Sequence, residues 1–264
     1  MNRAKERFDS GDLQGAIEEQ LSVVKSNPTD GEQRFFLAEL LALDGAWERA
    51  DRQLDTVLQQ TTGTSVYPLL FRQLLRAELI RRQVLTEGRT PELVTEKDDS
   101  IEVQLRLGLA DRTGESSDVP ELINRVGTLS DVVSGQCDGE PFRGLLDADL
   151  RLGLIAEILT ATGRYFWVPW ARFQSIEFAP AERPLDLIWR KATVQIDGGP
   201  DGEVYMPVRY TITENWDDDA KLGRSTQWID GTPGILRGVG QRLLLLGEQD
   251  RSILEITKIE FPVT

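Results

Sequence analysis

Asp147 and Asp149, in the stretch "LLDADLR", are the residues whose types and spacing come nearest to a catalytic pair. Two carboxylates are enough for glycoside hydrolysis, where one acts as the acid and the other as the base or nucleophile. The same residues precede Leu150–Leu159, which we expect to be helical, and Asp149 is well placed to cap that helix. The cap is the favoured interpretation, and a carboxylate-based hydrolase is the alternative.

The chain of 264 residues contains no histidine and a single cysteine, Cys137. Without imidazole there is no Ser-His-Asp or Cys-His nucleophile, no HExxH zinc site and no side chain that ordinarily titrates near pH 7. A lone cysteine cannot form an internal disulfide, so we expect Cys137 to be a small buried residue in a reducing compartment. These counts favour a protein that is not an enzyme.

Two further motifs contain residues that bind metals or cofactors in other proteins. The stretch "WDDDAK", Trp216–Lys221, gathers three carboxylates but lacks the ligand spacing of a calcium loop, so we expect a solvated loop or a helix start. The stretch "RGVGQR", Arg237–Arg242, contains a GxG without the third glycine of a dinucleotide site, and we expect a turn. The sequence therefore predicts no cofactor and no metal.

Charge and hydropathy limit the partners further. The chain has 44 acidic and 30 basic residues, which gives a net charge of −14 and repels phosphate backbones and anionic lipid. The longest aliphatic run is Leu243–Leu246, and the N-terminal residues contain no apolar signal segment. We therefore expect a cytoplasmic protein that binds neither nucleic acid nor membrane.

The first ninety residues have the pattern of helices with an internal repeat, which is clearest over Met1–Leu58. Ala16 and Ala50 are 34 positions apart in matching helical contexts, and 34 residues is the tetratricopeptide period. Pro28 ends the first unit, and the second begins near Gly31, with Ala38 on its first helix. We expect small residues at these positions because they allow two antiparallel helices to approach closely.

The helical pattern continues to about residue 140 but becomes less regular. Val66–Leu85 has the periodicity of one long helix, and Ser100–Arg112 with Val119–Val133 has that of a helical pair around Gly114. Pro120 stands near the position where that pair should carry a small residue. Irregular terminal repeats are common in such arrays, so residues 1–140 are expected to form a tetratricopeptide-like all-α superhelix.

The composition changes at "GQCDGEP", Gly135–Pro141, to turn residues, and short β-branched and aromatic segments follow. We expect residues 141–264 to form a small, mainly antiparallel α+β domain, so that the whole chain is a two-domain α+β protein. The expected strands are Tyr165–Val168, Ser175–Phe178, Ala192–Asp197, Glu203–Tyr210, Ser225–Asp230, Gln241–Leu246 and Ile253–Phe261.

The most aromatic of these segments, Tyr165–Val168, is apolar on both alternating faces. We expect one face to pack inside the β domain and the other against the helices. The alternative is a partner groove, since Pro169 and Trp170 follow directly. A second distinctive piece, "RPLDLIWRKA" at Arg183–Ala192, has the pattern of an amphipathic helical turn whose apolar residues pack on the sheet while its basic residues pair with local acids.

A series of motifs from Cys137 to Phe261 resembles the ImpE family, also called TagJ, of type VI secretion accessory proteins. The motifs that carry the resemblance are, in order, "CDGEPF", "DADLR", "GRYFWVPW", "IEF", "RPLDLIWRKA", "GPDGEVYMPVRY", "LGRSTQWID", "GVGQRLLLLGE" and "LEITKIEF". The resemblance implies a cytoplasmic interaction protein without catalytic residues. Its implied partner is the N-terminal helical segment of the small sheath subunit, with the ATPase that recycles contracted sheath as a further partner.

Two surfaces are candidates for binding that partner. If the repeat register is correct, the concave side of the first helices is lined by Lys5, Phe8, Phe35, Glu39, Gln73 and Arg76. The family motifs supply a second set, Arg183, Trp189, Arg190, Arg224 and Trp228. Tetratricopeptide-like helices form concave surfaces that accept peptide segments, so a general peptide-binding adaptor or chaperone with unrelated clients is the alternative function.

Overall fold

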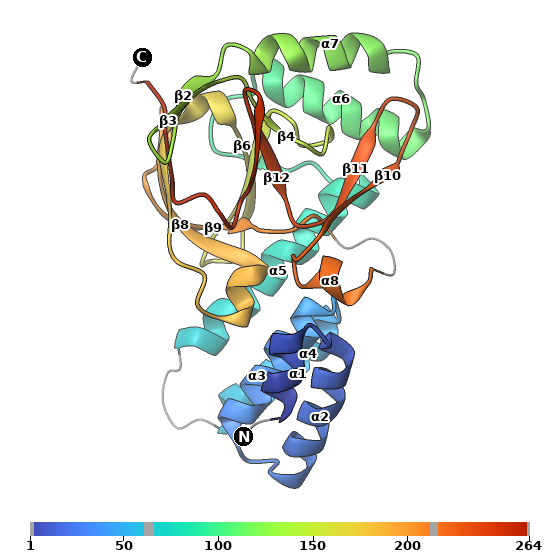
Figure 1. Cartoon of the computed structure of the whole chain (residues 1–264), viewed down its shortest axis with the longest axis vertical. Helices are drawn as coiled ribbons and strands as arrows, with labels where there is room; N and C mark the ends of the chain where they lie inside the picture. The colour runs from blue at the N-terminus through green and yellow to red at the C-terminus, as the bar shows by residue number, and fades with distance from the viewer. Residues whose placement is uncertain (1–2, 61–65, 212–215, 263–264) are drawn as a thin grey trace.

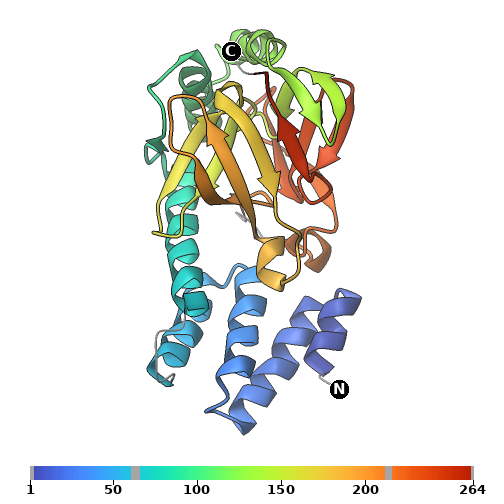
Figure 2. The same ribbon diagram turned by 90° about the vertical axis from the view of Figure 1, so that its left-hand side faces the viewer.

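The computed structural model describes residues 3–60, 66–211 and 216–262. Figures 1 and 2 show helices from the start of the chain at one end of an elongated molecule and a sheet-rich body at the other. The chain is therefore a helical N-terminal region followed by an α+β body, as expected.

Four N-terminal helices form the predicted repeats. They are α1 (Arg3–Ser10), α2 (Leu13–Ser26), α3 (Gly31–Leu43) and α4 (Trp47–Gln60). Ala16, Ala38 and Ala50 are fully buried between helices, where a larger side chain would force them apart. The side chains of Asp12 and Asp30 cap the N-termini of α2 and α3. The helices and the buried small residues expected from the repeat are therefore present.

The 22-residue helix α5 (Val66–Glu87) connects the repeats to the body, as Figure 2 shows. Its inner face is apolar, with Phe71, Leu74 and Leu75 buried, and this produced the periodicity seen in the sequence. None of the described helices, α5 included, has the length and apolarity needed to cross a membrane.

The helical pair expected around Gly114 is present as α6 (Asp99–Thr113) and α7 (Val119–Ser130). Gly114 ends α6 with a φ of 77°, a conformation that glycine adopts without strain. Pro120 lies in the first turn of α7, where a proline is tolerated because no backbone N–H is needed. Figure 1 shows this pair at the opposite end of the molecule from α1–α4, so it does not extend their array.

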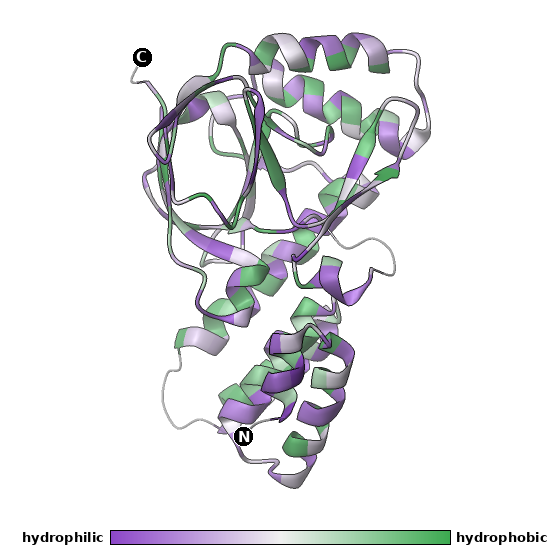
Figure 3. Ribbon diagram, viewed as in Figure 1, coloured by the Kyte–Doolittle hydropathy of each residue, from purple (hydrophilic) through white to green (hydrophobic). Residues whose placement is uncertain are grey.

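The body contains one large sheet and two small ones. The large sheet has the order β1-β6-β5-β9-β8-β7-β14-β2-β3, and the small sheets are β13-β12-β4 and β10-β11. Figure 3 shows β12 as a continuous hydrophobic segment.

The strands are β1 (Glu92–Leu93), β2 (Ser134–Cys137), β3 (Glu140–Arg143), β4 (Leu145–Asp147), β5 (Ile155–Leu159), β6 (Tyr165–Pro169), β7 (Phe173–Phe178), β8 (Trp189–Ile196), β9 (Gly202–Pro207), β10 (Thr226–Asp230), β11 (Leu236–Gly240), β12 (Leu243–Leu246), β13 (Gln249–Ser252) and β14 (Lys258–Glu260). Short helices η1 (Trp170–Arg172), η2 (Pro184–Leu187) and α8 (Asp218–Lys221) lie between them.

Pairing in the large sheet is antiparallel except between β1 and β6. The β2–β3 hairpin, where Cys137 pairs with Glu140, spans the expected domain division at residue 140. Strand β1, from the helical part of the sequence, joins the same sheet. Residues on both sides of residue 140 thus contribute to the body, and the division into 1–140 and 141–264 stays a prediction.

Strand β6 lies between two cores, as its doubly apolar sequence predicted. Tyr165 and Trp167 are buried in the core that the helices share with one face of the sheet. Val168 is buried in the second core, which lies within the body, and Phe166 packs against the same core. Trp170 is also buried, so the aromatic edge considered as a partner groove is not exposed.

The predicted helix at Leu150–Leu159 is wrong. Residues Ile155–Leu159 form β5, which pairs with β6 on one side and with β9 on the other. All five residues are buried. Because a short segment buried on both faces shows neither the two-residue period of a strand nor the period of a helix, its sequence does not distinguish the two. Asp149 therefore caps no helix.

Three smaller expectations also need correction. Arg237–Arg242 is not a simple turn, because Leu236–Gly240 is strand β11. The turn residues expected at Gly135–Pro141 are present as the turn of the β2–β3 hairpin, where Asp138 and Gly139 both have positive φ. The last strand covers only Lys258–Glu260 of the expected Ile253–Phe261. Arg183–Ala192 is η2 followed by the start of β8.

The body holds the repeats by capping their helix ends. The guanidinium of Arg209 donates to the carbonyls of Ala42 and Leu43 at the end of α3, with Nη2–O and Nη1–O distances of 3.0 and 2.7 Å. At the start of α2, Leu13 N donates to the Asp218 carboxylate over 2.8 Å. Asp218 belongs to α8, so "WDDDAK" is a helix start. The Asp218 carboxylate also accepts a hydrogen bond from the free N-terminal backbone of α2, a helix far away in the sequence.

Candidate functional site

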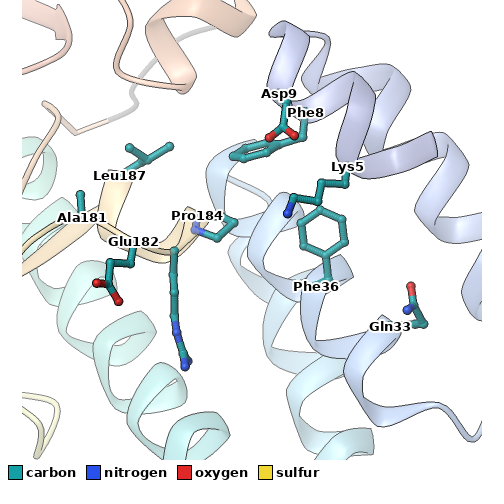
Figure 4. Close-up of a pocket in the computed structure, with 10 residues that line it drawn as sticks. Lys5, Phe8, Asp9, Gln33, Phe36, Ala181, Glu182, Pro184 and Leu187 are labelled. Atoms are coloured by element: carbon teal, nitrogen blue, oxygen red, sulfur yellow. The ribbon is translucent and has the colours of Figure 1, made fainter. Parts of the chain in front are cut away.

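A groove runs along α3 between the repeats and the segment that contains η2. It consists of two adjoining cavities of about 580 and about 630 Å³, which share Phe36 and Arg183. Figure 4 shows Lys5, Phe8 and Phe36 on the helical side of the first cavity and Pro184 and Leu187 on the other side. The groove is thus built from residues far apart in the sequence.

Aromatic contacts fix the helical wall of the groove. The rings of Phe8 and Phe36 meet edge to face with centroids 6.3 Å apart, and Phe35 meets Phe71 of α5 in the same way at 5.8 Å. At the far edge, the Arg183 guanidinium lies 4.4 Å from the centroid of the exposed Tyr67 ring. These contacts leave a half-buried apolar surface along α3.

Glu39 places a carboxyl group in the second cavity. Its side chain is 6% exposed, and burial raises its pKa to about 7. The nearby Arg183 lowers this pKa and Asp186 raises it, but both effects are smaller than that of burial. The groove therefore combines aromatic walls with one acid whose charge depends on pH in the neutral range.

Four of the six residues predicted on the concave side line this groove: Lys5, Phe8, Phe35 and Glu39. The other two, Gln73 and Arg76, instead approach the turn at Gly163. A Cβ at Gly163 would lie 2.6 Å from Gln73 Oε1 and 3.3 Å from Arg76 Cδ. Both side chains therefore contact the body and do not line the described cavities.

Two residues of the second predicted surface, Trp189 and Arg190, are buried. Trp189 is 0% exposed, and its Nε1 donates to Glu78 of α5 over 2.8 Å. Arg190 is 5% exposed and donates to backbone carbonyls, among them that of Ile253 at 2.7 Å. The prediction that Trp189 and Arg190 touch a partner is therefore wrong, and the expected pairing of Arg190 with local acids is wrong as well.

The remaining three residues of that set lie apart from one another. Arg183 lines both cavities of the groove, a position that the sequence did not indicate. Arg224 donates to the carbonyl of Asp9 at 3.1 Å and so ties the end of α1 to the body. Trp228 lies on β10, is 40% exposed and packs against Tyr210.

Asp147 and Asp149 are fully buried and belong to a charge cluster between α5 and the sheets. Asp147 faces Arg242 and accepts a hydrogen bond from the Tyr210 hydroxyl, and burial raises its pKa to about 6. Asp149 accepts from Arg151 Nε at 2.9 Å and from Gly238 N at 3.0 Å. Three of these four carboxylate oxygens accept hydrogen bonds from internal donors, and the fourth, Asp147 Oδ2, faces Arg242. Since neither side chain reaches solvent, the pair supports a structural function and not hydrolysis.

The centre of this cluster is Glu157 of β5, which the sequence analysis missed. Arg81 of α5 donates to both of its oxygens, at 2.9 and 3.0 Å, while Arg242 and the Tyr165 hydroxyl also contact it. Burial opposes ionisation, but the two arginines outweigh it and lower the pKa of Glu157 to about 2. A glutamate inside the apolar run "IAEIL" was the available sequence signal.

Known proteins resemble this chain in sequence and in structure. Residues 139–260 match the family model described as "ImpE protein". The chain is 30% identical over 263 residues to the "Type VI secretion system accessory component TagJ" of Pseudomonas aeruginosa, covering 99% of this chain and 92% of the relative. A crystal structure of a Vibrio parahaemolyticus protein superposes with a TM-score of 0.90 at 27% identity, covering 99% of this chain and 98% of the other.

Proposed function

Because the chain belongs to the ImpE/TagJ family, we propose that it is a non-enzymatic accessory protein of a bacterial type VI secretion system. Its function is to bind the N-terminal helical segment of the small sheath subunit in the cytoplasm. Through that contact it takes part in sheath assembly or in ATPase-driven recycling of the sheath.

The groove along α3 is the observation that carries this proposal. Its two adjoining cavities share Phe36, and the aromatic rings of Phe8 and Phe35 line one cavity each. An amphipathic helix binds such a groove by inserting apolar side chains spaced one turn apart, which suits two neighbouring cavities. Aromatic walls held in place by ring contacts favour binding, because they lose little conformational freedom when a ligand arrives.

A direct test is calorimetric titration of the full chain with a synthetic peptide of the cognate segment, without nucleotide or metal. Phe36→Glu places an unpaired charge where the two cavities meet and should weaken binding by ~2 kcal/mol or more. Leu109→Glu is the matched control, because Leu109 is an exposed apolar residue of α6 outside the groove. Thermal melts of both variants check that the fold is intact.

Trp228→Ala tests the alternative surface on β10 in the same titration. We expect it to bind like the wild type, since Trp228 lines neither cavity of the groove. Loss of binding in Trp228→Ala alone would move the site to the β10–β11 ribbon. Absence of heat and of competition with the wild type would remove the sheath segment as the partner.

A further inference from the structure

Glu39 stands out among the buried carboxyl groups of the described residues. Glu78, Asp111, Asp147, Asp149 and Glu157 each have an arginine partner. Within the described ranges, the carboxyl of Glu39 accepts no hydrogen bond and has no cation within 4.0 Å. A buried acid without a partner lowers the free energy of unfolding. Such a residue is therefore a candidate for a role in binding.

The charged groups around Glu39 do not neutralise it. Arg183 is the base whose charge acts on Glu39, but its guanidinium lies over the Tyr67 ring instead of forming an ion pair with Glu39. Asp186 of η2 adds a second negative charge, and Asp30 and Glu32 line the same cavity from the start of α3. The second cavity is therefore acidic, and it is open to a ligand.

Glu39 lies next to the aromatic residues of α3 that line the groove. On α3 it follows Phe35 by four residues and Phe36 by three, so it lies on the same face of the helix one turn further along. A ligand helix that inserts apolar side chains against these rings brings its next turn beside Glu39. The side chain at that turn meets a carboxyl group that has lost its water.

We propose that Glu39 determines the specificity of the groove by selecting a helix that places a lysine or arginine beside its carboxylate. This inference rests on the proposed function in taking the groove as the binding site. A basic side chain there supplies the missing counter-ion, whereas an acidic one adds a third like charge to those of Glu39 and Asp186. The partner is thus an amphipathic helix with one base on or beside its apolar face.

The protonation state of Glu39 gives the proposal a second readout. Burial keeps the pKa of Glu39 in the free protein near 7, and a bound cation favours the ionised form. Binding of a basic helix therefore releases a proton, and affinity should rise about tenfold between pH 6 and pH 8. The other charged or ionisable groups facing Glu39 are Arg183, Asp186, Asp30, Glu32 and Tyr67.

The experiment measures fluorescence anisotropy of labelled peptides with the full chain at pH 6 and pH 8. One probe is the sheath peptide, with versions in which each lysine or arginine is replaced by glutamine. A second probe is a designed amphipathic helix with lysine, glutamine or glutamate at one central position. The protein variants are Glu39→Gln and, as the matched control, Glu18→Gln, which removes the same charge from an exposed position on α2.

We expect the wild type to prefer the lysine peptide over the glutamate peptide by about tenfold or more at pH 8. Glu39→Gln should lose both this preference and the pH dependence, and Glu18→Gln should keep both. One glutamine-substituted version of the sheath peptide should lose as much affinity as Glu39→Gln, with no further loss when the two changes are combined.

The outcomes separate the two proposals. Binding of the designed lysine peptide through Glu39 without binding of the sheath peptide removes the sheath segment and leaves the inference standing. Binding of the sheath peptide with equal affinity by wild type and Glu39→Gln at both pH values overturns the inference and leaves the proposed function standing. Absence of binding by every peptide overturns both.

Discussion

Arg242 Nε lies 2.6 Å from Asp147 Oδ2, and neither side chain is exposed to solvent. The contact is an ion pair without the alignment of a hydrogen bond. On its other side the Arg242 guanidinium contacts Glu157, which Arg81 holds from α5. One arginine thus joins the small sheet of β4 to the large sheet, and the second arginine joins the large sheet to the helices.

Replacing Arg242 by methionine should destabilise the protein by ~3–5 kcal/mol, because it leaves Asp147 buried without its counter-ion. Urea denaturation followed by circular dichroism measures the change. Arg52→Met, at an exposed position on α4, is the control and should stay within ~0.5 kcal/mol of the wild type. A loss for Arg242→Met as small as that of the control would show that the cluster contributes little to stability.

Glu39→Gln should stabilise the unliganded protein in a pH-dependent way. Burial raises the pKa of Glu39 from 4.5 to about 7, so the unfolded chain loses this proton at a lower pH than the folded chain. The wild type therefore loses stability as pH rises from about 4.5 to about 7, and no more above that interval. Since the amide does not ionise, the variant should gain up to ~3 kcal/mol over wild type at pH 8 and much less at pH 5.

Urea unfolding at these two pH values provides the measurement for Glu39, with Glu18→Gln as the control. The control should show no such pH-dependent difference from the wild type. An equal difference between Glu39→Gln and wild type at pH 5 and pH 8 would mean that Glu39 is ionised at both.

Cys137 should be unreactive in the native state. Its side chain is 4% exposed on β2, and burial raises the pKa of its thiol to about 11, so little thiolate is present at pH 8. A chromogenic disulfide reagent should react with one thiol in denaturant and very slowly without it. Cys137→Ser should cost about 1 kcal/mol. Fast native reaction would show that β2 opens readily.

A fragment that begins at Asp147 should aggregate. Without the helices, Tyr165 and Trp167 lose the apolar side chains that cover them, and Glu157 loses Arg81. Size-exclusion chromatography with light scattering, compared with the full chain, measures the state of association. A monomeric fragment with a cooperative melt would contradict the position of β6 between two cores.

The helices were predictable from the sequence because their determinants are local. Ala16 and Ala50 repeat at the tetratricopeptide period, and Gly114 marks the end of a helix. The β5 strand was not predictable, because a buried segment in mid-sheet lacks alternation. Its Glu157 depends on Arg81, which is 76 residues earlier, and no local pattern reports such a pair.

The groove was only half predictable for the same reason. Lys5, Phe8, Phe35 and Glu39 follow from the repeat register, which places them on one side of the helices. Arg183 reaches them because the η2 segment folds over α3, and that contact depends on the whole topology. The sequence also does not separate buried motif residues from exposed ones. Tryptophan is a residue type common at contact surfaces, yet Trp189 is part of the core.

The caps that the body provides to the repeats also determine when the groove can form during protein synthesis. Helices α2 and α3 leave the ribosome long before Arg209 and Asp218 have been translated, and until then their end groups are bonded to water. Arg183, which forms part of the groove, is also made late. A chain that ends before Arg183 therefore lacks a residue that lines both cavities of the groove.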